Sequence, residues 1–242
     1  MNLIIDIGNT RGKVAFFSNG KMNASFSQSD ITVEDLKKWK QNHPELENVI
    51  ISSVRILPQQ LLVEANALFD NVIELTHSTP VPIQNLYKTP ETLGADRLAA
   101  AIGANSLHPD TPILIVDAGT AITYELVNDK NQYLGGNISP GLNTRFKALH
   151  HFTGKLPLLK ADEINAHMGQ NTAEAIIQGV VIGMVYEIEG YINQLKMSYP
   201  KLKVFLTGGD ANFFDKKLKN SIFVDFNLIM YGLNRILEFN VK

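Results

Sequence analysis

The residues best suited to chemistry lie in a turn near the amino terminus, which reads Asp6-Ile7-Gly8-Asn9-Thr10-Arg11-Gly12-Lys13. Glycines allow successive backbone N–H groups to point into one anion-binding concavity. Asn9 and Thr10 add hydrogen-bonding side chains, and Lys13 adds a positive charge. Asp6 ends an apolar strand, and its carboxylate repels phosphate but can hold hydrated magnesium. The turn therefore predicts phosphate binding, although an ordinary hairpin turn has the same composition.

A second turn, Asp117-Ala118-Gly119-Thr120, repeats this arrangement after the apolar run 113–116. One such turn alone is most often structural, whereas two turns that each follow a strand-ending aspartate favour a shared ligand. Matched turns facing each other across a cleft can hold successive phosphates of a nucleotide, with Asp117 as a second cation ligand. Neither the G-x-x-x-x-G-K-[ST] loop nor the G-x-G-x-x-G pattern occurs in the chain.

Asp96 and Arg97 form a candidate acid-base and anion-binding pair at the start of an alanine-rich helix. Asp96 can accept a proton from a substrate hydroxyl, and Arg97 can bind an anionic group with two parallel hydrogen bonds. The alternative is structural, since a carboxylate in the first turn of a helix also interacts favourably with the helix dipole. The preceding loop, 76–92, carries Tyr87 and three prolines, and we expect it to line a substrate pocket.

Two further motifs lie in the second half of the chain. Thr172 begins a long apolar helix and can present its hydroxyl to a ligand, although Asn171 and Glu174 have the spacing of a capping box, which favours a structural role. Gly208 and Gly209 follow a short strand, where they permit a flat group such as adenine to lie against the backbone.

Composition excludes several classes of protein. The 242 residues include 22 basic and 24 acidic side chains, so the net charge of −2 argues against a nucleic-acid partner. The absence of cysteine removes disulfides, thiol nucleophiles and cysteine-bound zinc. The segment 176–192 contains Gln178, Glu187 and Glu189, so we expect no membrane span there. No positively charged residue precedes the short apolar run that begins at Leu3, so we expect no secretory signal at Met1. We therefore expect a cytoplasmic protein.

The predicted elements form two similar halves. The first contains strands at 3–7, 14–17 and 24–27, a helix from the N-cap Thr32, a strand at 49–54, a helix after Pro58, a strand at 72–75 and a helix at 95–105. The second repeats this order, with strands at 113–117, 122–127, 133–138, 204–206 and 222–224. We expect an α/β protein of two duplicated domains, 1–109 and 110–242, with the active site in the cleft between them.

The ordered motifs resemble those of type III pantothenate kinase, a bacterial enzyme of the actin, sugar-kinase and heat-shock-cognate superfamily with ribonuclease H-like domains. The resemblance covers nearly the whole chain and rests on Asp6-x-Gly8-Asn9-Thr10-x-x-Lys13, Tyr87, Gly94-Ala95-Asp96-Arg97, Asp117-Ala118-Gly119-Thr120, Asn171-Thr172 and Gly208-Gly209. It implies that ATP phosphorylates the terminal hydroxyl of pantothenate to give 4'-phosphopantothenate, the first step of coenzyme A biosynthesis.

The resemblance also implies a role for each matching residue. The segment 6–13 forms the first phosphate loop, Thr120 contacts ATP in the second, and Asp96 is the proton acceptor. Asp117 ligates a monovalent cation, K⁺ or NH₄⁺, beside the Mg²⁺ that accompanies ATP. Pantothenate is held by Tyr87, Gly94, Ala95, Asp96, Arg97 and Thr172, the last from the partner subunit of a homodimer. The second domain then carries the adenine site and the dimer helix.

One position departs from the family pattern, because Gly12 stands where many members carry a bulkier strand residue. Two other interpretations remain open on the residues alone. One is a superfamily phosphotransferase acting on a sugar or a carboxylate, although such chains are usually longer. The other is a regulatory accessory factor, since the family resembles proteins first described as affecting transcription. A carboxylate base beside two phosphate turns favours the kinase.

Overall fold

The computed structural model describes residues 1–8, 11–162 and 168–241. These residues form two compact units, which are described separately below. The first comprises Met1–Asp110, Asn131–Tyr133 and Asn227–Lys242, and the second comprises Thr111–Lys130 and Leu134–Phe226. This grouping differs from the expected division at two places, because the tripeptide 131–133 and the carboxy-terminal helix both belong with the first unit.

The first unit is built on a five-stranded sheet in the order β3-β2-β1-β4-β5. Its strands are β1 (Asn2–Ile7), β2 (Gly12–Ser18), β3 (Lys21–Gln28), β4 (Asn48–Ser53) and β5 (Asn71–Glu74), and its helices are α1 (Val33–Asn42), α2 (Gln59–Leu68), α3 (Ala95–Leu107) and α7 (Leu228–Asn240). The apolar run of β1 pairs antiparallel with β2 and parallel with β4. Leu3, Ile5 and Ile51 of these strands are fully buried, so β1 is the central strand of the core.

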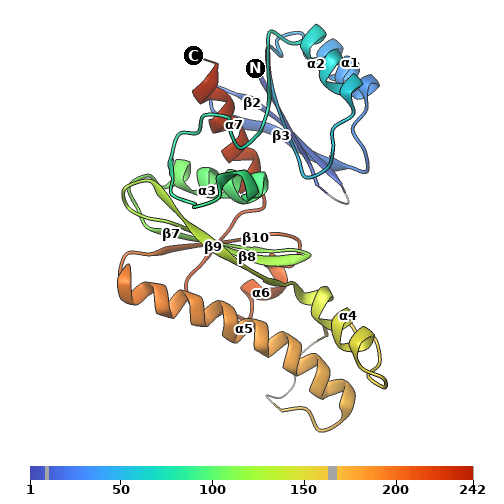
Figure 1. Ribbon diagram of the computed structural model, residues 1–242, viewed down its shortest axis with the longest axis vertical. Coiled ribbons are helices and arrows are strands. Elements are labelled where there is room, and N and C mark those ends of the chain that lie inside the picture. The colour runs from blue at the N-terminus through green and yellow to red at the C-terminus, as the bar shows by residue number, and fades with distance from the viewer. Residues whose placement is uncertain (9–10, 163–167, 242) are drawn as a thin grey trace. The chain divides into compact units, whose positions relative to one another are not determined.

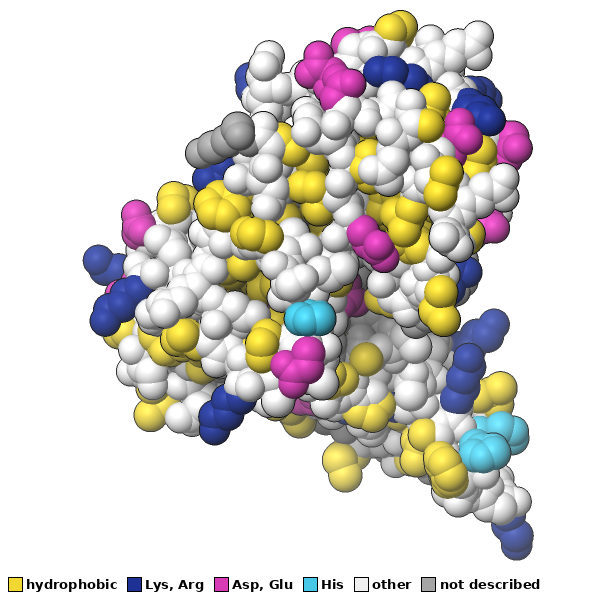
Figure 2. Space-filling view, turned by 45° about the horizontal axis from the view of Figure 1, so that its top comes forward, with side chains coloured by type: hydrophobic (Ala, Val, Ile, Leu, Met, Phe, Trp, Pro, Cys, Tyr) yellow, Lys and Arg dark blue, Asp and Glu magenta, His cyan; other side chains and the backbone are white. Residues whose placement is uncertain are grey.

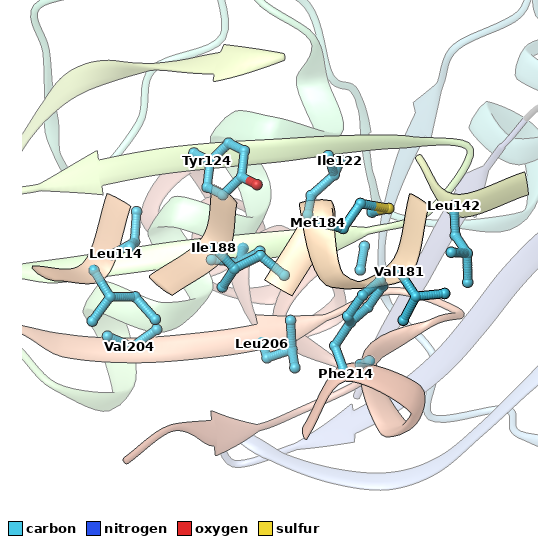
Figure 3. Close-up of a cluster of buried hydrophobic side chains, with 14 of the residues drawn as sticks. Leu114, Ile122, Tyr124, Leu142, Val181, Met184, Ile188, Val204, Leu206 and Phe214 are labelled. Atoms are coloured by element: carbon cyan, nitrogen blue, oxygen red, sulfur yellow. The ribbon is translucent and has the colours of Figure 1, made fainter. Parts of the chain in front are cut away.

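The second unit repeats this strand order as β9-β8-β7-β10-β11. Its elements are β7 (Ile113–Ala118), β8 (Ala121–Val127), β9 (Gln132–Pro140), α4 (Leu142–Phe152), α5 (Thr172–Ser198), β10 (Lys203–Thr207), α6 (Ala211–Asp215) and β11 (Phe223–Val224). Figure 3 shows the core of this unit, in which Leu114, Val204 and Leu206 of the sheet meet Val181, Met184 and Ile188 of α5. The two halves therefore share one topology, as predicted.

Helix α5 passes a length and composition test for a membrane span, with a mean hydropathy of 1.4 over its most apolar window. The core helix of a globular protein passes the same test. Figure 1 shows α5 lying along the sheet of its own unit, and Val181, Ile188 and Ile192 bury their side chains there. On the same helix, Glu187 and Glu189 accept hydrogen bonds from Arg145 and Asn220. This pattern is typical of a helix that completes a protein core.

Local signals predicted most element boundaries correctly, with one omission. Thr32 caps α1 in a full capping box with Asp35, and Trp39 is a buried packing residue against Phe16. The segment 76–92 is less irregular than expected, because it contains the two-residue strand β6 (Gln84–Asn85) and a 3₁₀ turn at Pro90–Thr92. β6 pairs with Gln132 and Tyr133, the first two residues of β9. These two residues belong to the first unit, as β6 does, and the rest of β9 belongs to the second.

A row of side-chain hydrogen bonds joins the starts of three parallel strands to α7. Asn71 donates to Asn48, Asn48 donates to Asn2, Asn2 donates to Asn234, and Asn234 donates to Glu238, at distances of 2.7 to 2.9 Å. The three strand residues are aligned in register. Because each amide needs a donor and an acceptor partner, a shift of one strand would break two bonds, and the row holds α7 in register with the sheet.

Helices α3 and α7 are neighbours in the first unit (Figure 1), and their backbones approach unusually closely at two glycines. A Cβ added to Gly103 would stand 1.9 Å from the carbonyl oxygen of Leu228, and one added to Gly232 would stand 1.8 Å from that of Ala99. Only residues without a side chain allow the two backbones to meet in this way. The crossing connects α3, which carries Asp96, to α7, and α7 packs on β1, which carries Asp6.

We predict that Gly103→Ala destabilises the protein strongly, by about 2–4 kcal/mol, because the added methyl group overlaps backbone that cannot rotate away. Urea unfolding followed by circular dichroism measures the effect. Gly190→Ala is the matched control, since Gly190 lies within α5 with open space around its Cβ position. There the substitution is expected to stabilise by up to about 1 kcal/mol. Equal stability of the two variants would contradict the close crossing.

Candidate active site

The first predicted phosphate turn connects β1 to β2. Gly8 donates its N–H to the Arg11 carbonyl at 3.0 Å, and the strand register places Asp6 opposite Lys13 and Ile7 opposite Gly12. Asn9 and Thr10 lie outside the described residues. Gly12 is a buried position at which a Cβ would stand 2.6 Å from the Ile31 side chain. The Ile31 side chain thus occupies the space that a larger residue would need, which accounts for the departure at Gly12.

Asp6 is the most perturbed carboxyl group of this unit. It is 8% exposed at the carboxyl end of β1, and burial raises its pKa from 3.8 to about 6. The Ser52 hydroxyl, which is opposite Asp6 in the β1–β4 register, lowers the pKa, Asp96 raises it, and Lys13 lowers it. A buried carboxylate with a second carboxylate nearby is stabilised by a bound cation. These residues therefore fit a hydrated magnesium ion that accompanies a phosphate group.

Asp96 and Arg97 lie in the first turn of α3, as predicted. Gly94 is the N-cap and Ala95 the first helical residue. Asp96 is half-buried, and its Oδ1 accepts the Arg97 backbone N–H at 2.8 Å. A Cβ on Gly94 would stand 2.6 Å from that oxygen, so glycine leaves the space in which the carboxylate lies. The charge of Asp96 raises the pKa of Asp6, which links the start of α3 electrostatically to the end of β1.

Tyr87 meets Arg97 through its aromatic ring, since the guanidinium carbon lies 5.8 Å from the ring centre. This arrangement is a cation–π contact. The two residues are separated by ten positions in the chain, and the short strand β6 directs the segment toward α3. The structure therefore brings together four of the predicted site residues of the first unit: Asp6, Tyr87, Asp96 and Arg97.

In the second unit, Asp117 ends β7 beside a tight backbone turn. Gly208 has φ +91, and a Cβ there would stand 2.4 Å from Asp117 Oδ1 and 2.5 Å from the Ala118 carbonyl oxygen. Only glycine adopts this conformation in this space. A carboxylate and a carbonyl oxygen at one strand end are the ligands that hard cations prefer. The geometry fits a cation at Asp117, although no cluster of three metal-binding side chains occurs among the described residues.

Thr120 is exposed in the second turn, between β7 and β8. Its carbonyl oxygen accepts the Gly141 N–H at 3.1 Å and the Thr144 hydroxyl at 2.7 Å. Arg145, one residue further along α4, donates to the Pro140 carbonyl at 2.7 Å and forms an ion pair with Glu187 of α5. The start of α4 thus fixes the turn that carries Thr120.

Thr172 is exposed as the first residue of α5, and Asn171 caps the helix by accepting the Glu174 N–H at 3.0 Å. The Glu174 side chain accepts from Gln170 rather than from the cap residue, so only half of the expected capping box forms. Thr172 borders an apolar cavity of about 730 Å³, lined by Pro140, Arg145, Ala148, Leu149, Leu156, Thr172, Ala175, Ile176, Gly179 and Val180.

Three residues that contact the predicted site residues were not identified from the sequence. Ser52 lies opposite Asp6, Thr144 holds the Thr120 carbonyl, and Tyr133 contacts Arg97. A polar residue at the end of the apolar run 49–54 is a signal that could have identified Ser52. Thr144 and Tyr133 carry no local signal, because their roles depend on which strands and helices become neighbours.

Comparison with known proteins identifies a family that the chain matches. The model of the type III pantothenate kinase family matches residues 2–194. A type III pantothenate kinase of Phocaeicola vulgatus is 49% identical over 242 residues, which is 100% of both chains. Another, from Porphyromonas gingivalis, is 43% identical over 243 residues and 99% of each chain.

Solved structures share the fold at lower identity. A Campylobacter jejuni protein assigned to the Baf family of transcriptional activators has a TM-score of 0.61 at 23% identity over 98% of each chain. A glucokinase from an Antarctic psychrotroph has a TM-score of 0.54 at 11% identity over 99% of each chain. At these identities the likeness establishes the fold alone. It confirms the predicted pair of ribonuclease H-like domains of the actin and sugar-kinase type.

The buried charge of Asp6 predicts a measurable cost to stability. Because the folded-state pKa of about 6 lies above the unfolded value of 3.8, ionisation opposes folding increasingly as the pH rises from 3.8 to 6. Asp6→Asn is therefore expected to stabilise the protein by about 2–3 kcal/mol at pH 7.5, and the gain shrinks toward pH 4. Urea unfolding at both pH values measures it. Asp30→Asn, at an exposed position, is the control and should change little. A gain that does not depend on pH would contradict the assignment.

Proposed function

The chain belongs to the type III pantothenate kinase family, and we propose that it transfers the γ-phosphate of ATP to the terminal hydroxyl of pantothenate through the residues described above. The product is 4'-phosphopantothenate, and the reaction is the first step of coenzyme A biosynthesis. The observation that carries the residue assignment is the proximity of Asp96, at the start of α3, to Asp6 at the phosphate turn. Phosphoryl transfer requires a base beside a phosphate-binding loop.

Asp96 is the proposed proton acceptor. Its Oδ1 is fixed by the Arg97 backbone N–H, so the carboxylate holds one orientation and presents Oδ2 to the substrate hydroxyl. A carboxylate in this position orients the primary alcohol for attack on the γ-phosphorus and takes its proton as the P–O bond forms. ADP leaves with the electron pair of the broken bond. The half-buried environment keeps the group accessible to substrate.

The phosphates of ATP are assigned to the segment 6–13 and to Thr120. The Lys13 ammonium group provides positive charge for the phosphates, and the glycines at positions 8 and 12 let the backbone approach them closely. When bound with ATP, Mg²⁺ supplies charge stabilisation to the phosphates, and Asp6 would hold it through its hydration shell.

Asp117 is assigned to the monovalent cation, K⁺ or NH₄⁺. Gly208 and Gly209 are assigned to the face of the adenine. Gly209, whose Cβ position faces open space, provides the open backbone surface that a flat ring requires.

Pantothenate is assigned to Tyr87, Gly94, Ala95, Asp96 and Arg97, with Thr172 supplied by the partner subunit of a homodimer. The buried Arg97 guanidinium provides the positive charge for an anionic substrate, and the Tyr87 ring limits the directions in which it can point. A dimer is supported by the apolar cavity beside Thr172 and by the exposed side chains of Phe152, Leu158 and Met168 in the same unit. Exposed apolar groups of this kind often mark protein interfaces.

The proposed partners are the two substrates and a second copy of the chain. We propose that the protein binds neither nucleic acid nor a membrane, and that it is located in the cytoplasm. Figure 2 shows acidic and basic side chains interspersed over the face in view, which agrees with the net charge of −2. A nucleic-acid surface concentrates basic groups instead.

We predict ADP release that requires pantothenate and is faster in potassium than in sodium buffer, measured by a coupled assay on the purified protein. Asp96→Asn should lower kcat by about 10²–10⁴-fold with little change in pantothenate KM, because the proton acceptor is lost while binding contacts remain. Lys38→Gln, on the exposed surface of α1, is the matched control. Folded protein that releases no ADP in either buffer would refute the kinase, and wild-type kcat in Asp96→Asn would refute the base.

A shared site predicts complementation between two inactive dimers. Asp96→Asn and Thr172→Arg are each expected to inactivate the homodimer, one through chemistry and the other through substrate binding. After the two variants are unfolded together and refolded, a mixed dimer has one site with both defects and one site with none. Activity should then return to about one quarter of the wild-type level, as expected from random pairing. If Thr172 serves its own subunit, mixing restores nothing.

A further inference from the structure

Tyr133 is a fully buried tyrosine whose hydroxyl group meets the side chain of Arg97. Its exposed fraction is 0%, and Arg97 Nη2 donates to its hydroxyl oxygen at 3.4 Å. The Tyr133 ring also lies 6.1 Å from the ring of Tyr87. A buried tyrosine hydroxyl is usually retained because it has a specific hydrogen-bonding partner. The partner here is a residue assigned to pantothenate.

The backbone around Tyr133 is tied to the segment that carries Tyr87. Gln84 donates its N–H to the Asn131 carbonyl at 3.1 Å, and Leu86 donates to the Tyr133 carbonyl at 2.9 Å. The side chain of Gln132 donates to that of Gln84 at 2.6 Å. β6 therefore forms only because 131–133 offers it a strand edge, and this pairing sets the position of Tyr87, two residues after the end of β6.

The same tripeptide is also attached to α3 and to the loop that follows it. Asn131 adopts φ +57 and accepts from the Asn105 side chain at 2.7 Å and from the Asp110 N–H at 3.0 Å. Its own amide donates to the Asp110 carboxylate at 2.7 Å. These bonds reach the end of α3 opposite to Arg97. Residues 131–133 consequently hold both elements that supply the acceptor-binding side chains.

The guanidinium of Arg97 needs such support because it is 8% exposed and permanently charged. Removing a cation from water is costly unless its donors are matched by acceptors or aromatic faces. The Tyr87 ring provides an aromatic face and the Tyr133 hydroxyl provides an acceptor. Since the guanidinium is planar, contacts in different directions restrict its rotation and help to fix where its N–H groups point.

We propose that Tyr133 is a positioning residue for the acceptor substrate, which acts by holding the Arg97 guanidinium in the orientation that binds pantothenate. The inference rests on the proposed function, because it takes Arg97 as a pantothenate-binding residue. Tyr133 does not touch the substrate, since its side chain has no exposed surface. Its hydroxyl therefore affects how tightly pantothenate is held and not the rate of phosphoryl transfer.

The test is Tyr133→Phe, which removes one oxygen atom and keeps the ring. We expect the pantothenate KM to rise roughly 3- to 10-fold, as for loss of one hydrogen bond to a charged group, and kcat to stay within about 2-fold. In an Arg97→Ala background the same substitution should have no further effect on KM, because its route of action is gone. Tyr231→Phe is the matched control in the same unit, since the Tyr231 ring packs against Phe17.

A second readout does not depend on turnover. Nuclear magnetic resonance of ¹⁵N-labelled arginine side chains should show slow rotation about the Nε–Cζ bond of Arg97 in the wild type and faster rotation in Tyr133→Phe. An unchanged KM, a KM effect that persists without Arg97, or unchanged rotation would each overturn the proposal. Wild-type protein that does not phosphorylate pantothenate would refute the proposed function instead, and the rotation of Arg97 would still decide whether Tyr133 positions it.

Discussion

The burial of the Asp6 carboxylate is the constraint on which the first unit depends. A charged group at the end of a fully buried strand loses most of its hydration, and the raised pKa of about 6 reflects that loss. The nearby Asp96 adds repulsion, whereas Ser52 and Lys13 offset part of the cost. A protein core alone would not retain this arrangement, since an apolar residue would be more stable there. A ligand that brings cations to Asp6 would remove this penalty, which supports the proposed binding of ATP and its metal there.

The rest of the first unit keeps the two carboxylates in place. β1 fixes Asp6 through pairing on both sides, and α3 fixes Asp96 at its first turn. Helix α7 joins them, because it crosses α3 at Gly103 and is bonded to β1 through Asn234 and Asn2. The last helix of the chain thereby positions residues near its beginning. Close backbone contact and a continuous row of amides both resist sliding, so the distance between Asp96 and Asp6 is set by rigid elements.

The duplicated topology assigns different tasks to equivalent turns. In the first unit the strand-ending aspartate is buried beside a lysine and a second carboxylate. In the second unit Asp117 lies beside the Gly208 turn and the Ala118 carbonyl, and the neighbouring Thr120 is held by the start of α4. The same strand–turn–strand pattern thus provides an acidic, desolvated environment in one copy and an oxygen-rich backbone environment in the other. This difference comes from residues outside the two turns, such as Asp96 at the start of α3 in the first unit and Gly208 after β10 in the second.

The sequence by itself determined the local features and the family. Apolar runs, the Thr32 cap and the paired aspartate–glycine–threonine turns predicted the succession of strands and helices in both halves and the elements that carry Asp6, Asp96 and Asp117. These signals are readable because hydrophobic periodicity and turn chemistry act over a few residues. Only the tertiary structure decided that α7 and residues 131–133 belong to the first unit, that β6 exists, and that Tyr133 meets Arg97. Such contacts join residues 21 or more positions apart, and their energy arises from packing and burial, which leave no trace in the local pattern.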